Sequence, residues 1–286
     1  MTTTIKNENY RPKPRHQTVI EAKNGWQLID WQELRQYRDL FYFLVWRDIK
    51  VLYKQTVLGF AWAIIRPVFS MIVFSLVFGR LAQIPSDGVP YPIFSYAALV
   101  PWTYFSTAMT NSTQSLVSNA GMFTKVYFPR LVIPLTPVLA GLVDFAIAFL
   151  LVGVLMVWYG IAPTWNVLFL PLLIMLMVLT AAGVGLTLSA LAIQYRDIRF
   201  AMPFASQLLM YAAPVVWPVS LVPDQFRWLY GLYPMAGVIE GFRAALLGTT
   251  PMPWDLILMG SISATVLMLF GALYFRRMER IFADVA

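Results

Sequence analysis

Residues 100–130 read VPWTYFSTAMTNSTQSLVSNAGMFTKVYFPR, and this segment indicates what kind of fold the chain adopts. If it is helical, its hydroxyl and amide side chains recur every three to four residues and share one side. They are Thr103, Thr107, Thr110 or Asn111, Gln114 and Ser118. Apolar and aromatic residues fill much of the remaining surface, and the segment ends in a basic loop that contains Pro129. A membrane helix with one polar side predicts a polar path that is coupled, through this loop, to something outside the bilayer.

The composition of the whole chain also indicates a membrane protein. Of the 286 residues, 59% are hydrophobic and only 12% are charged, whereas soluble domains carry about 25% charged residues. Several apolar runs reach the roughly 20 residues that a helix needs to cross a bilayer. The chain contains no cysteine, so disulfides and thiolate metal sites are excluded. We therefore expect an all-α integral membrane protein.

Six apolar segments predict six transmembrane helices. They cover about 60–81, 93–112, 131–159, 167–193, 200–221 and 256–275. Three prolines in the fifth segment predict a kinked or broken helix there. In the fourth segment, Ala181, Gly185 and Ser189 form a stripe of small residues that permits close packing between helices of the same chain.

Residues 224–248, between the fifth and sixth spans, are too apolar for a free loop and too interrupted for a full crossing. Pro234 and Gly248 stand where a helix begins and ends, following the usual asymmetry of proline and glycine. Glu240 and Arg243 have the i, i+3 spacing of an ion pair on that helix. We expect a re-entrant or interfacial helical segment here.

The chain divides into three predicted regions. Residues 1–23 form a disordered cytoplasmic tail, because their prolines and charges cannot continue a helix. Residues 24–56 contain an amphipathic helix at about 31–55, whose basic side suits anionic headgroups at the membrane interface. A soluble helix packed on another subunit is the alternative for this segment. Residues 57–286 form the six-span membrane domain.

Two ionisable residues fall inside the predicted spans. A charge at membrane depth is costly and usually faces a cavity, a partner or the interface. Arg66 has two interpretations: it faces a polar path, or its long side chain reaches the nearby interface. Asp144 is either a functional site or a structural hydrogen-bonding group, and one acid alone makes a poor proton relay.

Lysine and arginine indicate the orientation of the chain. They gather in the amino-terminal region, in the 125–130 and 196–199 loops and in the carboxyl tail. The alternate loops contain only Arg80, Arg227 and Arg243. The positive-inside rule therefore predicts that both termini are cytoplasmic, and this topology explains most of the net charge of +7 without nucleic acid.

The sequence contains no recognisable catalytic arrangement. The motifs GxxxxGK[ST], HExxH and GxSxG are missing, and no nucleophile, base or metal-ligand set can be assembled. We therefore predict no catalytic residue, no metal site and no cofactor in this chain. These observations favour a conduit over an enzyme.

Several segments resemble the permease subunits of type-2 ABC polysaccharide exporters, the group that handles O-antigen, capsule and teichoic acid. The resemblance covers about 40–280 in the same order. The matching segments are YKQTVLGFAW (53–62) with Pro67, PW (101–102) with Phe105, KVYFPR (125–130), RD (196–197), and YP (233–234) with residues 240–248. It implies a homodimer in the bacterial inner membrane that is joined by two copies of a cytoplasmic ATPase, which bind ATP and Mg. It also implies a lipid-linked glycan as substrate.

The resemblance and the polar helix together imply three functional regions. The substrate path is expected to include Trp62, Arg66, Phe69, Trp102, Thr103, Tyr104, Phe105, Thr107, Thr110 and Asn111. The ATPase is expected to dock on the interface helix and on Lys125, Val126, Tyr127, Phe128, Pro129, Arg130, Arg196 and Asp197. The outer gate is expected to include Tyr233, Pro234, Glu240 and Arg243.

The function expected from these features is export of an O-antigen-like or capsular polysaccharide. Sugars present apolar ring faces and many hydroxyls, so aromatic platforms beside hydroxyl side chains suit a sliding polymer. Each contact should be weak, because conduction requires release as well as entry. Three alternatives stay open: a type-2 ABC permease for a lipid or drug, an ATPase-independent secondary transporter or channel, and a membrane glycosyltransferase or acyltransferase.

Overall fold

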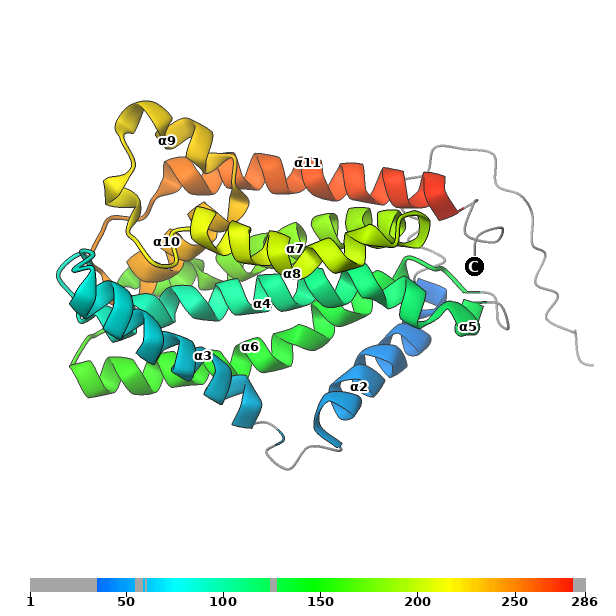
Figure 1. The fold of residues 1–286 in the computed structure, drawn as a ribbon, viewed down its shortest axis with the longest axis horizontal. Coiled ribbons are helices and arrows are strands. Elements are labelled where there is room, and N and C mark those ends of the chain that lie inside the picture. Colours follow the sequence, from blue (N-terminus) through cyan, green and yellow to red (C-terminus); the bar gives the residue numbers. More distant parts are fainter. Residues whose placement is uncertain (1–34, 55–58, 60, 124–127, 280–286) are drawn as a thin grey trace, which may run out of the picture.

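Long apolar segments form helices in this protein because a helix satisfies every backbone hydrogen bond within its own segment. The computed structural model describes residues 35–54, 59, 61–123 and 128–279. Within these ranges the chain is helical and contains no strand, as the all-α prediction requires. The long helices run side by side in an elongated bundle (Figure 1). The predicted tail 1–23 and the loop residues 124–127 lie outside the described residues.

Four helices are long and apolar enough to cross a membrane. The first combines α3 (Ala61–Phe74) with the π-helix η1 (Ser75–Leu81), and it matches the first predicted span. The others are α6 (Val132–Tyr159), α7 (Leu170–Gln194) with the preceding turn η2 (Trp165–Phe169), and α11 (Trp254–Glu279). They correspond to the third, fourth and sixth predicted spans. The chain is therefore a multi-pass membrane protein.

The second and fifth predicted spans do not meet the same criteria. The second forms α4 (Tyr91–Ser118), which is long enough but carries many polar side chains. The fifth forms α8 (Asp197–Ala212), which is too short. It ends before Pro214, because a proline disfavours the helical conformation of the residue that precedes it. Ala213, which precedes Pro214, is accordingly extended. The count of six spans therefore stays a prediction.

Helix α4 occupies the middle of the bundle, where it packs on both α6 and α7. Its apolar side forms much of the buried core. The stripe of small residues on α7 packs within the chain as predicted, since a Cβ at Gly185 would collide with the side chain of Ser112 on α4. The polar positions of α4 are therefore held in place by helices on its other sides.

The two ends of the bundle differ in their elements. At one end, called the α10 end, lie α9 (Asp224–Gly231), α10 (Pro234–Leu247) and the connection between η1 and α4 (Figure 1). Helix α10 begins at Pro234 and ends before Gly248, whose φ of 66° favours glycine, as predicted. All fourteen residues of α10 are buried. Its predicted re-entrant position in a membrane stays a prediction.

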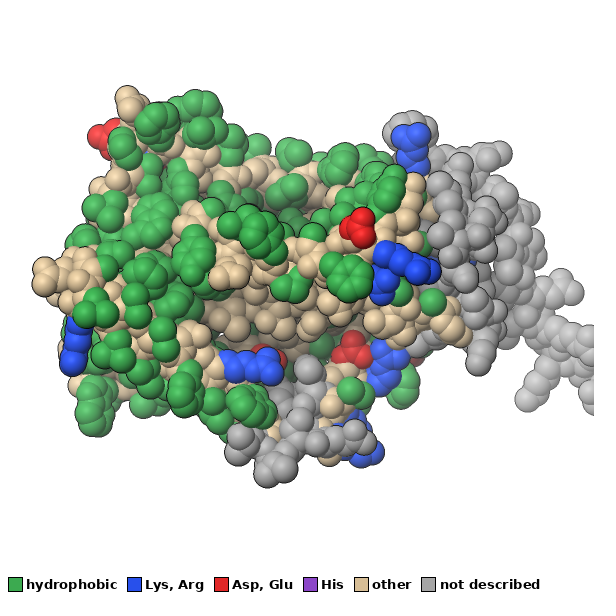
Figure 2. Space-filling view, viewed as in Figure 1, with side chains coloured by type: hydrophobic (Ala, Val, Ile, Leu, Met, Phe, Trp, Pro, Cys, Tyr) green, Lys and Arg blue, Asp and Glu red, His purple; other side chains and the backbone are tan. Residues whose placement is uncertain are grey.

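The opposite end, called the α5 end, contains α5 (Ala120–Phe123), the start of α6 and the turn between α7 and α8 (Figure 1). The described part of the interface helix forms α2 (Arg38–Lys54), which packs against α6. Figure 2 shows hydrophobic side chains over much of the visible face, with most of the visible lysines and arginines toward the α5 end. This distribution agrees with the charge asymmetry that the sequence predicts.

Candidate functional site

The predicted polar side of α4 lies on the surface of the chain. Its exposed members are Thr107, Asn111, Gln114 and Ser118, and its half-buried members are Thr103 and Thr110. The Thr110 hydroxyl donates to the Ser106 carbonyl oxygen at 2.8 Å, as hydroxyls in membrane helices often do. Ser206 on α8 donates to the Ser106 hydroxyl at 3.0 Å. Helix α8 therefore borders this side of α4.

The three aromatic residues of α4 that were expected on the same path do not share its exposed polar side. Trp102 and Tyr104 are each 4% exposed and Phe105 is 2% exposed, so all three belong to the core of the single chain. The Tyr104 hydroxyl donates to the Val138 carbonyl oxygen at 2.8 Å, and its ring packs on Phe145. The structure thus separates the buried rings of α4 from its exposed hydroxyls and amides.

Helix α3 presents the other aromatic candidates on its surface. Trp62 is 42% exposed and Phe69 is 64% exposed, and Arg66 is exposed between them. Their spacing of four and three residues places them on one side of α3. The Arg66 guanidinium lies 5.7 Å from the centre of the Trp62 ring, within the range of a cation–π contact. Helix α3 packs on α4, so both candidate surfaces belong to neighbouring helices.

The candidate docking residues lie at the α5 end where they are described. Phe128 is buried and Pro129 is half-buried, so both help to anchor the start of α6. Arg130 Nη1 donates to the carbonyl oxygen of Glu279 at 3.0 Å, which joins this loop to the end of α11. Lys125, Val126 and Tyr127 lie outside the described residues.

Arg196 lies in the turn that precedes α8 and Asp197 is the first residue of that helix, and both are exposed. Of the eight residues predicted for docking, these two therefore offer charged side chains at the surface of the described structure.

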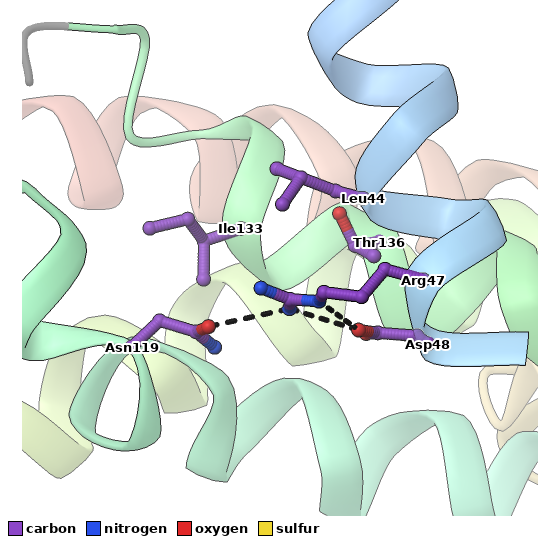
Figure 3. Close-up of a pocket in the computed structure, with 6 residues that line it drawn as sticks. All are labelled: Leu44, Arg47, Asp48, Asn119, Ile133 and Thr136. Atoms are coloured by element: carbon purple, nitrogen blue, oxygen red, sulfur yellow. Dashed lines mark hydrogen bonds and ion pairs between the residues drawn. The ribbon is translucent and has the colours of Figure 1, made fainter. Parts of the chain in front are cut away.

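A cluster at the α5 end joins the interface helix to α4 and α6 (Figure 3). Arg47 on α2 donates to Asp48 from Nε and Nη2, at 3.0 and 2.8 Å. Nη2 also donates to Oδ1 of Asn119, 3.3 Å away, at the carboxyl end of α4. Beside them, Leu44 and Ile133 are both 3% exposed and pack in the same place. This cluster was not predicted, because Arg47 reads as one more basic residue of an amphipathic helix.

The predicted outer-gate residues Glu240 and Arg243 form a buried ion pair at the α10 end. Arg243 Nη1 lies 3.3 Å from Glu240 Oε2, and the two side chains are 1% and 5% exposed, respectively for Arg243 and Glu240. Arg243 also donates to the carbonyl oxygens of Val215, Trp217 and Phe94, at 2.8, 3.3 and 3.3 Å. The i, i+3 pairing that the sequence predicts is therefore confirmed.

These carbonyl acceptors explain why α10 holds an arginine in a buried position. The chain after α8 is not helical around Val215 and Trp217, so their carbonyl oxygens need partners from elsewhere. Tyr233, at the start of α10, adds a contact by donating from its hydroxyl to the Leu209 carbonyl oxygen at 3.3 Å. These contacts join α10 to α4 and to the non-helical segment that follows α8. The group is called here the Arg243 cluster.

Comparison with known proteins identifies relatives of this chain. The family model described as "ABC-2 type transporter" matches residues 39–247. The O-antigen export system permease protein RfbA of Myxococcus xanthus is 28% identical over 252 residues, which cover 87% of this chain and 96% of that protein. An RfbA protein of Klebsiella pneumoniae is 27% identical, with 86% of this chain and 95% of that protein covered.

A more distant relative is the polysialic acid transport protein KpsM of Escherichia coli. It is 24% identical over 207 residues, which cover 70% of this chain and 78% of that protein. The family match spans the interface helix, the polar helix α4, the turn before α8 and the Arg243 cluster. The chain belongs to the ABC-2 type transporter family.

Proposed function

We propose that this chain is the permease subunit of an ATP-driven exporter of a lipid-linked polysaccharide, O-antigen-like or capsular. The relatives named above are O-antigen export permeases and a polysialic acid transport protein, which supports a glycan substrate. Two copies of the chain work with two copies of a cytoplasmic ABC ATPase, and that partner binds ATP and Mg. The assembly lies in the bacterial inner membrane with both termini of the chain in the cytoplasm.

The observation that carries this proposal is the exposed polar side of α4. Among the described residues, none forms a hydrogen bond with the side-chain amides of Asn111 and Gln114, although both residues lie on the long helix α4. Amides that face lipid would lose their water without gaining a partner, which is unfavourable. A second copy of the chain would cover this side and enclose a hydrated path along it.

The path that we propose is narrower than the one expected from the sequence. It keeps Trp62, Arg66 and Phe69 of α3 together with the exposed and half-buried polar residues of α4. It leaves Trp102, Tyr104 and Phe105 in the core, where they support α4 from behind. Rings on α3 beside hydroxyls on α4 provide the weak, repeated contacts that a sliding glycan requires.

The proposed topology has six spans, with α4 and α8 added to the four helices that meet the criteria. Helix α4 has 28 residues, which at about 1.5 Å per residue exceeds the roughly 30 Å of a bilayer core. Helix α8 is shorter, and the broken chain that follows it completes the crossing beside the re-entrant helix α10. Irregular backbone is tolerated there because the Arg243 cluster supplies its hydrogen bonds.

Motion of the ATPase would reach the membrane through the α5 end. The proposed docking surface consists of α2, residues 125–130, and Arg196 with Asp197. Pro129 limits the backbone of the loop, and Arg130 ties the loop to α11. A displacement of this surface would therefore move α4, α6 and α11 together, rather than bending the loop alone.

Substitutions on the polar side of α4 test the proposal. In cells that lack the native gene, Thr107→Leu combined with Asn111→Leu is expected to lower surface glycan at least about tenfold, because an apolar wall cannot exchange hydrogen bonds with the polymer. Glycan-lipid should then accumulate on the inner leaflet. Thr265→Leu is the matched control, since Thr265 is exposed on α11 and its hydroxyl bonds only to its own helix, at Ser261.

The same cells separate the alternatives. Normal surface glycan after deletion of the gene would contradict polysaccharide export and favour a lipid or drug substrate. Failure of a nucleotide-binding subunit to copurify in mild detergent would favour a secondary transporter. Normal export by the Thr107→Leu, Asn111→Leu variant, at normal abundance, would remove α4 from the path while leaving the transporter class intact.

A further inference from the structure

A groove opens between α3 with η1 and the rest of the bundle. It contains about 830 Å³ of empty space, part of which is open to the surroundings. Its walls come from α3 and η1 on one side and from the start of α4 and the end of α6 on the other. Of the four candidate spans, the one formed by α3 and η1 is the least buried, so the groove faces the surroundings of the bundle.

The groove is built by a local change in helix type. Residues 75–81 form a π-helix, a wide turn that is rare and often marks a functional position. Gly79 lets this turn approach α4, because a Cβ there would lie 2.8 Å from Cγ of Tyr91. Tyr91 cannot easily yield, since its hydroxyl donates to the Val216 carbonyl oxygen at 2.6 Å. The π-helix and α4 therefore meet at Gly79, which closes the groove there, and Tyr91 is held in place as part of its wall.

Most of the lining of the groove is apolar, and its polar side chains include Ser75, Tyr159 and Arg80. Met71, Ile72, Leu76 and Pro92 supply apolar wall. The Ser75 hydroxyl donates to the carbonyl oxygen of Met71 at 2.6 Å and is thus already engaged. The lining therefore suits a hydrocarbon chain along most of its length.

Arg80 gives the groove a charged end. It lines the groove, its side chain is exposed, and no described residue pairs with its guanidinium. It is the penultimate residue of the candidate span Ala61–Leu81, the depth at which lipid headgroups begin. A guanidinium binds a phosphate with two parallel hydrogen bonds, which makes arginine well suited to phosphate groups.

We propose that this groove is a binding site for one phospholipid of the surrounding bilayer. One acyl chain lies against Met71, Ile72 and Leu76, and the headgroup phosphate contacts Arg80. The lipid fills the space between α3 and the bundle, and thereby holds α3 at a fixed distance from α4. The inference goes beyond polysaccharide export, because it concerns a lipid that is bound and not transported.

Photo-crosslinking of the assembled transporter in bilayer nanodiscs tests the site. The probe is a phosphatidylglycerol with a diazirine on one acyl chain, and the labelled residues are mapped by mass spectrometry. Labelling of residues 71–76 is expected to fall about tenfold in Arg80→Gln, the loss of a charge-assisted hydrogen bond, and to be largely retained in Arg80→Lys. Ile72→Trp, which fills the groove, should lower it as well.

Matched controls make the result specific. Arg227→Gln removes another arginine at the α10 end, one that does not line the groove and that pairs with Asp255, and labelling should not change. A diacylglycerol with the same diazirine chain lacks the phosphate and should label residues 71–76 only weakly. Equal labelling by the two probes, or unchanged labelling in Arg80→Gln, would overturn the proposal.

Two further outcomes would assign the groove to another occupant. If polyprenyl phosphate displaces the probe better than unlabelled phosphatidylglycerol does, the site belongs to the lipid carrier, and the phospholipid assignment is wrong. Because the chain has no cysteine, Leu76→Cys introduces a single thiol. Efficient disulfide formation between two such chains would show that a second copy covers the groove, which also overturns the proposal. None of these results depends on whether glycan export is confirmed.

Discussion

The two ends of the bundle each use an arginine to join segments that are far apart in the sequence, but in different surroundings. At the α10 end, Arg243 is 1% exposed and reaches Glu240 and three carbonyl oxygens. At the α5 end, Arg47 is 33% exposed and reaches one group beyond its own helix, the Asn119 amide. Water can replace a lost partner only at the exposed site. We infer that the α10 end holds one arrangement, whereas the α5 end can be displaced at low cost.

Replacement of Arg243 with Gln is expected to have the largest effect on stability. It would leave Glu240 as a buried charge without its partner, and the free energy of unfolding should fall by about 3–5 kcal/mol. The carbonyl oxygens of Val215 and Trp217 would lose their donor as well. Thermal unfolding of the purified protein in detergent and its abundance in membranes measure the effect.

Glu240→Gln sharpens the same test. The neutral amide still accepts a hydrogen bond from Arg243, and the three carbonyl contacts of Arg243 remain, so the loss should be clearly smaller. Equal losses in the two variants would mean that the ion pair alone stabilises this end and that the carbonyl contacts contribute little.

The part of this cluster that could be predicted shows how far the sequence reaches. Glu240 and Arg243 lie on one helix, so their spacing alone predicts the pair. The acceptors of Arg243 are main-chain oxygens, which every residue carries and which therefore leave no trace in the sequence. The single signal was indirect: Pro214 and Pro218 interrupt the helix, and an interrupted helix has carbonyl oxygens that need donors.

The same limit explains why the sequence could not separate the rings of α4 from its polar side. Its periodicity predicts correctly that Thr103, Thr107 and Asn111 share one side. Trp102 and Phe105 were placed with them from the resemblance to a family, although each residue on a helix is rotated by about 100° from the next. That rotation carries both rings into the core, where the structure finds them.

The Arg47 contact is expected to affect transport more than stability. Arg47→Ala should lower the free energy of unfolding by only about 1 kcal/mol, because water replaces the lost hydrogen bonds. The amount of glycan exported per ATP hydrolysed should fall severalfold, because a displacement of α2 would no longer be transmitted through this contact to the end of α4. The measurement is ATPase activity and export by the same reconstituted transporter.

A double-mutant cycle with Asn119→Ala separates this contact from other roles of Arg47. If the two side chains act through each other, the double variant should couple ATP to export no worse than either single variant. Independent, additive losses would instead show that Arg47 affects transport without acting through Asn119, and the α5 end would lose its proposed link to α4.

The smallest effect is expected for Arg227→Ala. This variant tests whether the burial of an arginine, or its place at the α10 end, determines how much stability is lost. Arg227 on α9 pairs with Asp255 on α11, so it also joins two segments at the α10 end, but the side chains are 36% and 51% exposed. An exposed pair contributes about 0–1 kcal/mol, and salt screens it. The melting temperature should therefore change by little at low salt and by less at high salt. A loss as large as that of Arg243→Gln would mean that the α10 end is sensitive throughout, and that burial of Arg243 is not what distinguishes the two ends.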